Sequence, residues 1–440
     1  MSTDEHIPTS TVPVSAASEQ VAAEPGGPPS RMTRYLWLVL ASAFLAWMFD
    51  SIALNVFTLI LTPSMADLLH TTDRAAIVGT GGLIVAIKLA AWGIGGTLFG
   101  VLTDRFGRAR IMLVTILIYA VFTALSAASQ DWVQLAVFQA IAGLGIGGEW
   151  SAGAALLAES LPERLRPRLM IVMQLAFSVG YFFAAVVNLG VGASSWRLVL
   201  VWCAAPAVLV LVLRLFVKEP EQWVRVQRRS GQALGSLRRL FEPDLRRRTL
   251  GGFFSAAALM VGSFAATTFT PSWIASLSTG GAAVAAQNTS YFAMLLNGGA
   301  IVGYVALIWL TASRIGRRGS YFVFCLGSLV TAILMFSLAR SVDAILWVTP
   351  IAGFFMLGGF GVFAVWLPEM FPTAVRGTGQ GFCFNFARII TGVGTLTTGV
   401  LVGGLGSFPT AGLIVSLVFA VGLFTIWIGP ETRGWRLSDA

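Results

Sequence analysis

Long apolar segments separated by short polar loops run along almost the whole chain. Of its 440 residues, 56% are hydrophobic and only 11% are charged. Each apolar segment is close to the roughly 20 residues that an α-helix needs to cross a bilayer core about 30 Å thick. The pattern predicts twelve helices, over residues 35–61, 77–102, 111–128, 132–158, 169–192, 196–217, 249–276, 289–312, 320–339, 343–367, 379–403 and 408–429. We therefore expect an all-α membrane protein with twelve transmembrane helices.

The positively charged residues predict how these helices are oriented. A net charge of +9 also suits a protein that binds nucleic acid, but these charges lie in short loops at alternate ends of the helices, which excludes that class. Three of the 29 Lys and Arg residues fall in the outer loops (Arg74, Arg197, Arg340) and two fall inside helices (Lys88, Arg388). Because Lys and Arg accumulate on the cytoplasmic side, both termini are expected there. The expected location is the plasma membrane, or the inner membrane of a bacterium.

Polar stretches divide the chain into two bundles. Residues 1–33 lack an apolar core and predict a disordered cytoplasmic tail, and residues 430–440 predict a second one. Residues 218–248 form a basic cytoplasmic linker between six-helix bundles at 34–217 and 249–429. Its basic face is expected to lie against anionic lipid headgroups, with a regulatory protein as the alternative partner. The three cysteines lie in apolar segments and indicate neither a disulfide framework nor a metal site (Cys203, Cys325, Cys383).

One loop carries a distinctive motif, Gly100-Val-Leu-Thr-Asp-Arg-Phe-Gly-Arg-Ala-Arg110. Gly100 permits close approach of a neighbouring helix, Asp104 can cap a helix or pair with an arginine, and Gly107 permits a tight reversal. Arg105 and Arg108 hold the turn on the cytoplasmic side. The run resembles the signature between helices two and three of the major facilitator superfamily, Gly-x-x-x-Asp-Arg-x-Gly-Arg-Arg, with Ala109 as its one departure.

The two halves repeat one another. Residues 104–108 are echoed by residues 313–317 at an offset of 209, with Ser313 in place of Asp104. Glu159-Ser-Leu-Pro is echoed by Glu369-Met-Phe-Pro at an offset of 210. Parallel six-helix repeats describe the major facilitator fold, whose substrate site lies between the halves and works by alternating access. Since the second loop lacks the acid, we expect it to hold the two halves together less strongly than the first loop.

Further motifs resemble one branch of this superfamily. They are Gly143-Leu-Gly-Ile-Gly-Gly-Glu149-Trp150 and the run from Leu367 through Arg376 to Arg388. This branch holds the metabolite:proton, sialate and lactate:proton, and aromatic acid:proton symporters. Two positions depart from it: the first helix keeps only Asp50 of an Asp-Gly-aromatic-Asp run, with Ala53 at the second acid, and Gln139 stands where the fourth helix often has an arginine.

Four ionisable residues lie deep within the predicted helices: Asp50, Lys88, Glu149 and Arg388. Charges in hydrocarbon are costly, so such residues face a cavity or a partner and are functional candidates. Two acids and two bases sum to zero, and an organic anion entering this site leaves an uncompensated negative charge. Protonation of Asp50 or Glu149 removes that charge, so proton and anion favour each other's binding, as symport requires. The structural alternative for Glu149 and Arg388 is that they tie helix ends to loop backbones.

The remaining site candidates are polar residues within helices and charged residues of the loops. Asn55, Gln139 and Asn385 are candidate substrate contacts beside Lys88 and Arg388, with interhelical hydrogen bonding as the alternative. Glu159 and Glu369 are expected to close the cytoplasmic side by pairing with arginines of neighbouring loops, with Arg105 and Arg314 as partners. Gly100, Asp104, Gly107, Arg108 and Arg376 complete the loop motifs.

The sequence therefore predicts a monomeric secondary transporter that takes up a small organic acid with protons. It needs no cofactor, because the proton gradient supplies the energy, and its partners are the substrate, protons and the lipid bilayer. A proton antiporter for efflux, a sugar or polyol porter and a non-transporting sensor with a transporter fold remain as alternatives. An enzyme is disfavoured, since the sequence offers no paired loop carboxylates, metal cluster, or nucleophile with a base.

Overall fold

The computed structural model describes residues 31–191, 195–205, 207–229, 234–279, 281–405, 407–435 and 437. Residues 1–30 of the predicted N-terminal tail, 230–233 of the linker, and 436 and 438–440 of the C-terminal tail lie outside the described residues. Within them every regular element is a helix, as predicted. Among the described residues, eleven helical segments, some of which join two or more of the elements named below, are long and apolar enough to cross a membrane.

The described residues of the first half form seven helices. They are α1 (Arg34–Leu68), α2 (Arg74–Phe106), α3 (Arg108–Ser126), α4 (Trp132–Ser160), α5 (Arg166–Val191), α6 (Trp196–Ala204) and α7 (Ala207–Arg214). Polar caps fix where some of them begin: Thr33 accepts a hydrogen bond from the backbone N–H of Leu36, and Asp131 accepts one from Gln134 at 2.8 Å. The helix α4 is the most enclosed of them, with Gly143 to Glu159 buried almost throughout.

The second half contains more interrupted helices. They are α9 (Pro243–Thr268), α10 (Thr270–Leu277), α11 (Gly281–Ala312), α12 (Gly316–Leu338), α13 (Val342–Ala352), α14 (Gly361–Met370), α15 (Arg376–Gln380), α16 (Ala387–Leu405), α17 (Phe408–Ser416) and α18 (Val418–Thr425). Short irregular turns complete them: η2 (Gly353–Leu357), η3 (Gly358–Phe360), η4 (Thr373–Val375) and η5 (Gly381–Phe386). Both η2 and η5 are π-helical, a local form that is frequent at functional sites. The span expected at 379–403 is therefore α15, η5 and α16 in sequence.

The linker is partly helical and packs onto the protein. It contains α8 (Glu221–Arg229) and the 3₁₀ turn η1 (Arg238–Phe241). The helix α9 begins at Pro243, not at 249 as expected, because proline suits the first position of a helix. The indole of Trp223 donates to the carbonyl of Asp104 at 2.9 Å, and the N–H of Gly235 donates to Ala374 of the second half at 3.0 Å. The linker thus contacts both halves.

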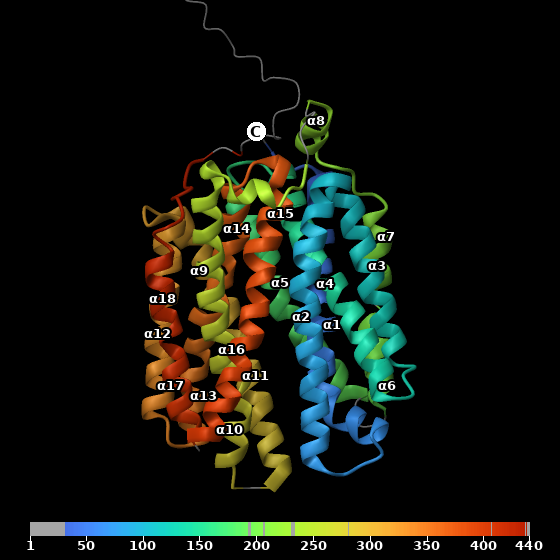
Figure 1. Cartoon of the computed structure of the whole chain (residues 1–440), viewed down its shortest axis with the longest axis vertical. Coiled ribbons are helices and arrows are strands. Elements are labelled where there is room, and N and C mark those ends of the chain that lie inside the picture. Colours follow the sequence, from blue (N-terminus) through green and yellow to red (C-terminus); the bar gives the residue numbers. More distant parts are fainter. Residues whose placement is uncertain are drawn as a thin grey trace, which may run out of the picture.

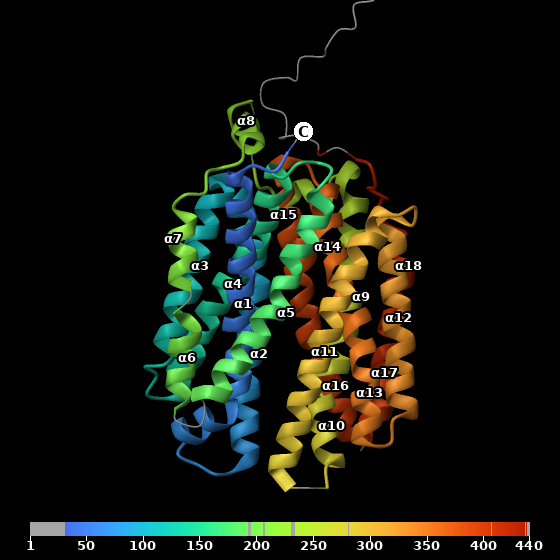
Figure 2. The same cartoon turned by 180° about the vertical axis from the view of Figure 1, so that it is seen from behind.

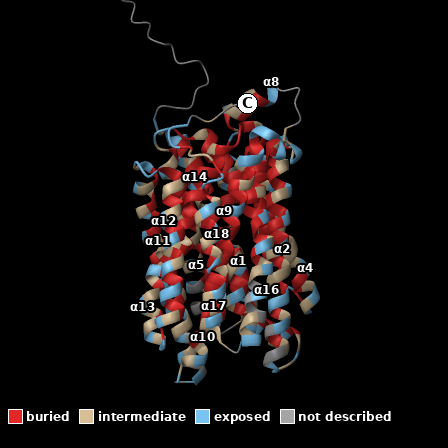
Figure 3. Cartoon of the chain, turned by 60° about the vertical axis from the view of Figure 1, so that its left-hand side comes forward, coloured by how far each residue is buried: buried red, intermediate tan, exposed pale blue. Residues whose placement is uncertain are grey.

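The two halves lie side by side, with α8 at one end of the molecule, which we call the linker end (Figure 1). Seen from behind, α5 of the first half runs next to α11 of the second (Figure 2). Buried residues crowd the linker end, whereas intermediate and exposed residues dominate the opposite end (Figure 3). The halves are therefore packed most tightly at the linker end.

Candidate functional site

Asp104, at the end of α2, ties the first half to the second. Its Oδ1 accepts from the backbone N–H of Gly377 at 3.0 Å, and its Oδ2 accepts from the N–H and hydroxyl of Thr378 at 2.7 and 2.6 Å. These N–H groups belong to the first turn of α15, where a carboxylate is stabilised by the unpaired N–H groups and the helix dipole. Asp104 is thus a helix cap supplied from the other half of the molecule.

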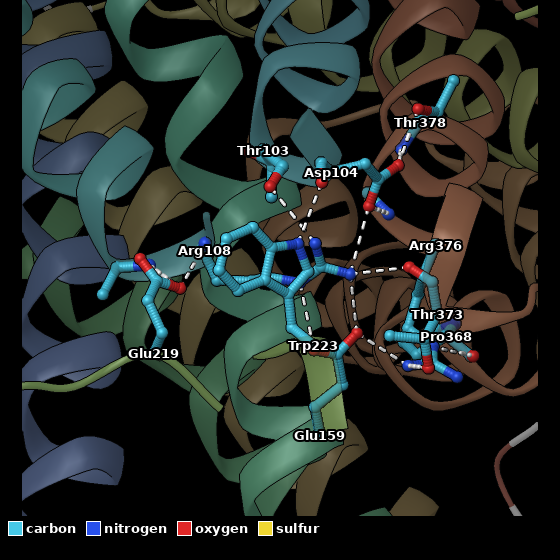
Figure 4. Close-up of polar contacts among 12 residues, drawn as sticks. Thr103, Asp104, Arg108, Glu159, Glu219, Trp223, Pro368, Thr373, Arg376 and Thr378 are labelled. Atoms are coloured by element: carbon cyan, nitrogen blue, oxygen red, sulfur yellow. Dashed lines mark hydrogen bonds and ion pairs between the residues drawn. The ribbon is translucent and has the colours of Figure 1, made fainter. Parts of the chain in front are cut away.

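Arg108 and Glu159 extend this contact (Figure 4). Arg108 donates from Nε and Nη2 to both oxygens of Glu159, at 3.0 and 2.9 Å, and also to the carbonyl of Thr373 at 2.7 Å. Glu159 accepts in addition from Nη1 of Arg376, 2.7 Å away in the second half. The expectation that Arg105 pairs with Glu159 is wrong: the Nε of Arg105 donates to the carbonyl of Leu234 in the linker.

The equivalent loop of the second half makes fewer contacts across the molecule. Glu369 accepts from Nη2 and Nε of Arg317, at 2.8 and 3.1 Å, and from the hydroxyl of Thr432, all in its own half. Arg314, the expected partner, is exposed, and the Ser313 hydroxyl donates to Leu310 in its own helix. The interface at the linker end therefore depends on the Asp104 and Glu159 contacts, which agrees with the expected weakness of the second loop.

Glycines bring α2 against the second half near the linker end. A Cβ atom on Gly100 would lie 2.6 Å from the carbonyl oxygen of Gly377, and one on Gly96 would lie 2.2 Å from Cβ of Asn385. Such distances leave no room for a side chain at either position. The close approach of α2 to α15 and η5 therefore depends on glycine.

Toward the end of the molecule opposite the linker end, the facing surfaces of α2 and α16 separate. Gly82 lies fourteen residues, about four helical turns, before Gly96 and thus on the same face of α2. A Cβ atom on Gly82 would meet no described atom within 4 Å, and the same holds for Gly392, seven residues after Asn385. The halves therefore touch near the linker end and diverge beyond it.

Asp50, Glu149 and Arg388 lie between the region where the halves touch and the region where they diverge. All three are buried, with exposed fractions of 0%, 1% and 6%. Asp50 on α1 lies close enough to Glu149 on α4 and to Arg388 on α16 for their charges to interact. The structure thus brings together two acids of the first half and a base of the second.

Aromatic rings surround these charges. The Arg388 guanidinium carbon lies 3.8 Å from the ring centroid of Trp92 and 4.5 Å from that of Phe384. Trp150, next to Glu149, stacks on Phe384 across the two halves, with 4.0 Å between the ring centroids. Trp47 packs against both Trp92 and Trp150 at 6.5 and 6.3 Å. The surroundings of the three charges are therefore apolar and largely flat.

Several hydrogen-bond donors beside this cluster have no acceptor. Within the part of the chain that the structure describes, the indole N–H groups of Trp47 and Trp92 and the Nε of Arg388 are buried without a partner. The other end of the Arg388 guanidinium donates to Oδ1 of Asn385 at 2.7 Å and to the carbonyl of Phe384 at 3.1 Å. A buried donor without an acceptor costs about 1–3 kcal/mol. A ligand that only accepts hydrogen bonds, such as a carboxylate, would recover that cost.

This arrangement of helices is that of known membrane transporters. The structure matches that of the proton:xylose symporter XylE with a TM-score of 0.74 and 20% identity, over 92% of this chain and 98% of that chain. The sequence model of the Major Facilitator Superfamily matches residues 36–394. The chain belongs to the Major Facilitator Superfamily.

Several relatives of this chain are named for the substrate that they transport. The cis,cis-muconate transport protein of Acinetobacter baylyi is 27% identical over 85% of this chain and 90% of its own length. The sialic acid transporter NanX of Escherichia coli is 25% identical over 91% of this chain and 96% of its own. The protein is thus a multi-pass membrane transporter of the Major Facilitator Superfamily, not an enzyme.

Two acids that support the superfamily signature escaped the sequence analysis. Glu219 accepts from the backbone N–H groups of Arg108 and Ala109, at 2.6 and 3.1 Å, and so caps α3. Glu431 caps α12 in the same way, accepting from Arg317 and Arg318 at 3.0 and 2.9 Å. A signal was present in the sequence: a proline with a neighbouring glutamate follows the sixth and the twelfth predicted helix, as Glu219-Pro220-Glu221 and Pro430-Glu431, and the Pro-Glu pair recurs at an offset of 210.

Lys88 and Gln139 form a pair within the first half. The Lys88 ammonium donates to Oε1 of Gln139 at 2.7 Å and to the carbonyl of Ala53 in α1 at 2.6 Å. Lys88 therefore supplies a cation beside the place where the branch often carries an arginine in its fourth helix. Asn55 donates locally to the carbonyl of Ser51, at 2.8 Å, whereas Asn385 donates across the halves to the hydroxyl of Ser151 at 3.0 Å.

Proposed function

We propose that the protein is a proton-coupled symporter that takes up a small organic carboxylate across the plasma membrane by alternating access. In this proposal twelve spans place both termini and the linker end in the cytoplasm, and the protein works as a monomer. The observation that carries it is the buried cluster of Asp50, Glu149 and Arg388, drawn from both halves.

The carboxyl pair supports proton binding. Two carboxylates buried in one site repel each other when both are ionised, as in other carboxyl pairs that share a site. Arg388 partly offsets the remaining charge of Asp50. In this proposal the pair binds a proton together with the substrate and releases it when the site opens to a compartment of higher pH.

The donors beside the pair support an anionic substrate. A carboxylate at Arg388 would accept from its free Nε and from the indole N–H groups of Trp47 and Trp92. The negative charge it brings would strengthen proton binding at Asp50 and Glu149, and by linkage the proton would strengthen carboxylate binding. The flat rings of Trp92, Trp150 and Phe384 favour a substrate with a planar apolar body. Relatives named for muconate and sialic acid agree with an acidic substrate.

The packing of the halves supports alternating access. The contacts of Asp104 and Glu159 close the linker end, while α2 and α16 diverge toward the other end. In the proposed orientation this is a state closed to the cytoplasm. Release of the substrate into the cell then requires these contacts to break and the opposite end to close.

Uptake by the purified protein in proteoliposomes tests the proposal. Labelled muconate, benzoate, nicotinate, sialic acid and xylose would be supplied with and without an inward proton gradient. We expect accumulation of at least one acid that collapses with a protonophore. The variant Asp50→Asn should lose accumulation and keep exchange, whereas Asp343→Asn, at an exposed acid in the first turn of α13, should behave as wild type. Uptake of xylose alone, or gradient-driven accumulation by Asp50→Asn, would overturn it.

A further inference from the structure

A basic cavity lies at the linker end of the second half, away from the substrate cluster. It measures about 330 Å³ and is lined by Asp244, Arg247 and Arg248 at the start of α9, Arg318 at the start of α12, and Trp435 with the segment 428–430 after α18. The proposed transport cycle uses none of these side chains.

The arginines of this cavity are held in place by backbone carbonyls. Nε of Arg247 donates to Ile428 at 2.9 Å, and Nη1 of Arg248 donates to Met370 at 3.0 Å. Nη2 of Arg318 donates to Trp427 at 3.4 Å. Because a guanidinium has five N–H groups, each arginine keeps further donors while its position is fixed.

In the part of the chain that the structure describes, the arginine side chains of the cavity have no carboxylate partner of their own, and Glu431 beside it is bound to the backbone N–H groups of Arg317 and Arg318. Asp244, the acid in its wall, is bound on both oxygens by Arg239, at 2.6 and 2.7 Å. Among the described residues no carboxylate oxygen lies within 4.0 Å of a guanidinium nitrogen of Arg247, Arg248 or Arg318. Three arginines thus converge on one cavity without a carboxylate partner, an arrangement that suits a phosphate.

The surroundings of the cavity suit a lipid rather than a free ion. The Arg318 guanidinium lies 4.5 Å from the ring centroid of Trp427, and that of Arg248 lies 5.3 Å from Trp435. Both indoles are about half exposed, and Phe424, one turn before Trp427, is 76% exposed. Tryptophan favours the headgroup level of a membrane, and an exposed phenylalanine favours its acyl chains. The cavity therefore lies where a polar headgroup gives way to hydrocarbon.

The first half lacks an equivalent of the key arginine. At the offset of 209 that relates the two signature loops, Arg318 corresponds to Ala109. The second loop therefore keeps an arginine of the signature that the first loop has replaced by alanine, and this arginine lines the cavity.

We propose that this cavity binds the phosphate headgroup of an anionic phospholipid of the inner leaflet, with its acyl chains along α18. Basic pockets at the cytoplasmic face between membrane helices are suited to such headgroups. A bound lipid would join the starts of α9 and α12 to the segment after α18, and so stabilise the second half as one body.

Native mass spectrometry of the full-length protein, released from detergent with phosphatidylglycerol or phosphatidylcholine, tests this inference. The variants are Arg247→Gln and Arg318→Gln. The matched control is Arg246→Gln, which changes the neighbouring exposed arginine outside the cavity wall. A parallel series adds inorganic phosphate to wild-type protein and lipid, so that one arm does not depend on the folding of a variant.

We expect the wild type to retain phosphatidylglycerol over phosphatidylcholine. Each single variant should retain roughly fivefold less, the factor equivalent to the ~1 kcal/mol that one arginine contributes near an anionic surface. The control should match the wild type, and millimolar phosphate should not displace the lipid. Equal retention of both lipids, unchanged retention by both variants, or displacement of the lipid by phosphate would overturn the proposal.

Discussion

Glu159 of the first half and Arg376 of the second are joined by an ion pair of 2.7 Å between Oε1 and Nη1, with both side chains buried. The pair echoed in the second half differs. Arg166, which corresponds to Arg376, reaches Glu369 only through longer-range electrostatics, while its Nη2 donates to the carbonyl of Leu161. The duplicated loops have thus become one strong and one weak contact between the halves.

Replacement of Glu159 should open the linker end. In Glu159→Gln the buried Arg376 loses its acid, and breaking a buried ion pair costs about 3–5 kcal/mol. We expect transport to fall at least tenfold. A cysteine placed at the contact between α2 and α15 should become accessible to a membrane-impermeant thiol reagent. Glu369→Gln breaks an ion pair within one half, to Arg317. It should lower thermal stability without raising that accessibility, and equal labelling of both variants would contradict this assignment.

Gly100→Ala tests the closed contact between α2 and α15. The new methyl group would lie 2.6 Å from the carbonyl oxygen of Gly377, so the halves must separate there. We expect reduced uptake and a larger spin-label distance across the linker end. Gly82→Ala, on the same face of α2 but with open space around it, is the control and should change neither quantity. A short distance that persists in Gly100→Ala would mean that closure does not depend on this contact.

The turn at Gly107 should resist substitution for two separable reasons. Its φ of 114° is unfavourable for other residues, at about 1–3 kcal/mol, and a Cβ atom would lie 2.4 Å from Oε1 of Glu219. Gly434 has a φ of 81° but open space around it. The alanine variant of Gly107 should therefore lower the unfolding temperature more than that of Gly434. Equal decreases in unfolding temperature would show that the contact with Glu219 does not contribute to stability.

The Lys88 and Gln139 pair predicts a compensating double variant. Lys88→Met leaves the side chain of Gln139 without its cation, and Gln139→Arg places a second cation beside Lys88. Both single variants should lose uptake and thermal stability. The double variant restores one cation between α2 and α4, so we expect it to recover a substantial part of both, as residues in contact are coupled. Additive losses in the double variant would show that the two positions act independently.

The helical fold could be predicted because its signal is local. Apolar runs near 20 residues, the loop signature and the echoes at offsets of 209 and 210 are all visible in the sequence. The buried position of Asp50, Glu149 and Arg388 followed from the cost of charge in hydrocarbon. The partners of the loop acids did not follow, because Arg105 and Arg108 are three residues apart on a turn and only tertiary packing decides which of them faces Glu159.

The breaks within the later helices were also beyond the sequence pattern. The π-helical turn η5 differs from an α-helix in its hydrogen bonding, whereas its composition, Gly-Phe-Cys-Phe-Asn-Phe, reads as ordinary apolar helix. The capping role of Glu219 depends on the return of the chain to α3 from a position more than 100 residues later. Such contacts are set by the fold as a whole.

In the proposed cycle a proton at Asp50 and Glu149 and a carboxylate at Arg388 bind together. Proton uptake on substrate binding tests it directly, with the purified protein in weakly buffered solution containing a pH-sensitive dye. Addition of the transported acid should alkalinise the wild-type sample by about one proton per substrate bound, as linkage between the two ligands requires. Asp343→Asn should give the same signal. Asp50→Asn should bind the acid but take up few or no protons. Binding of the acid without proton uptake by the wild type would contradict the account.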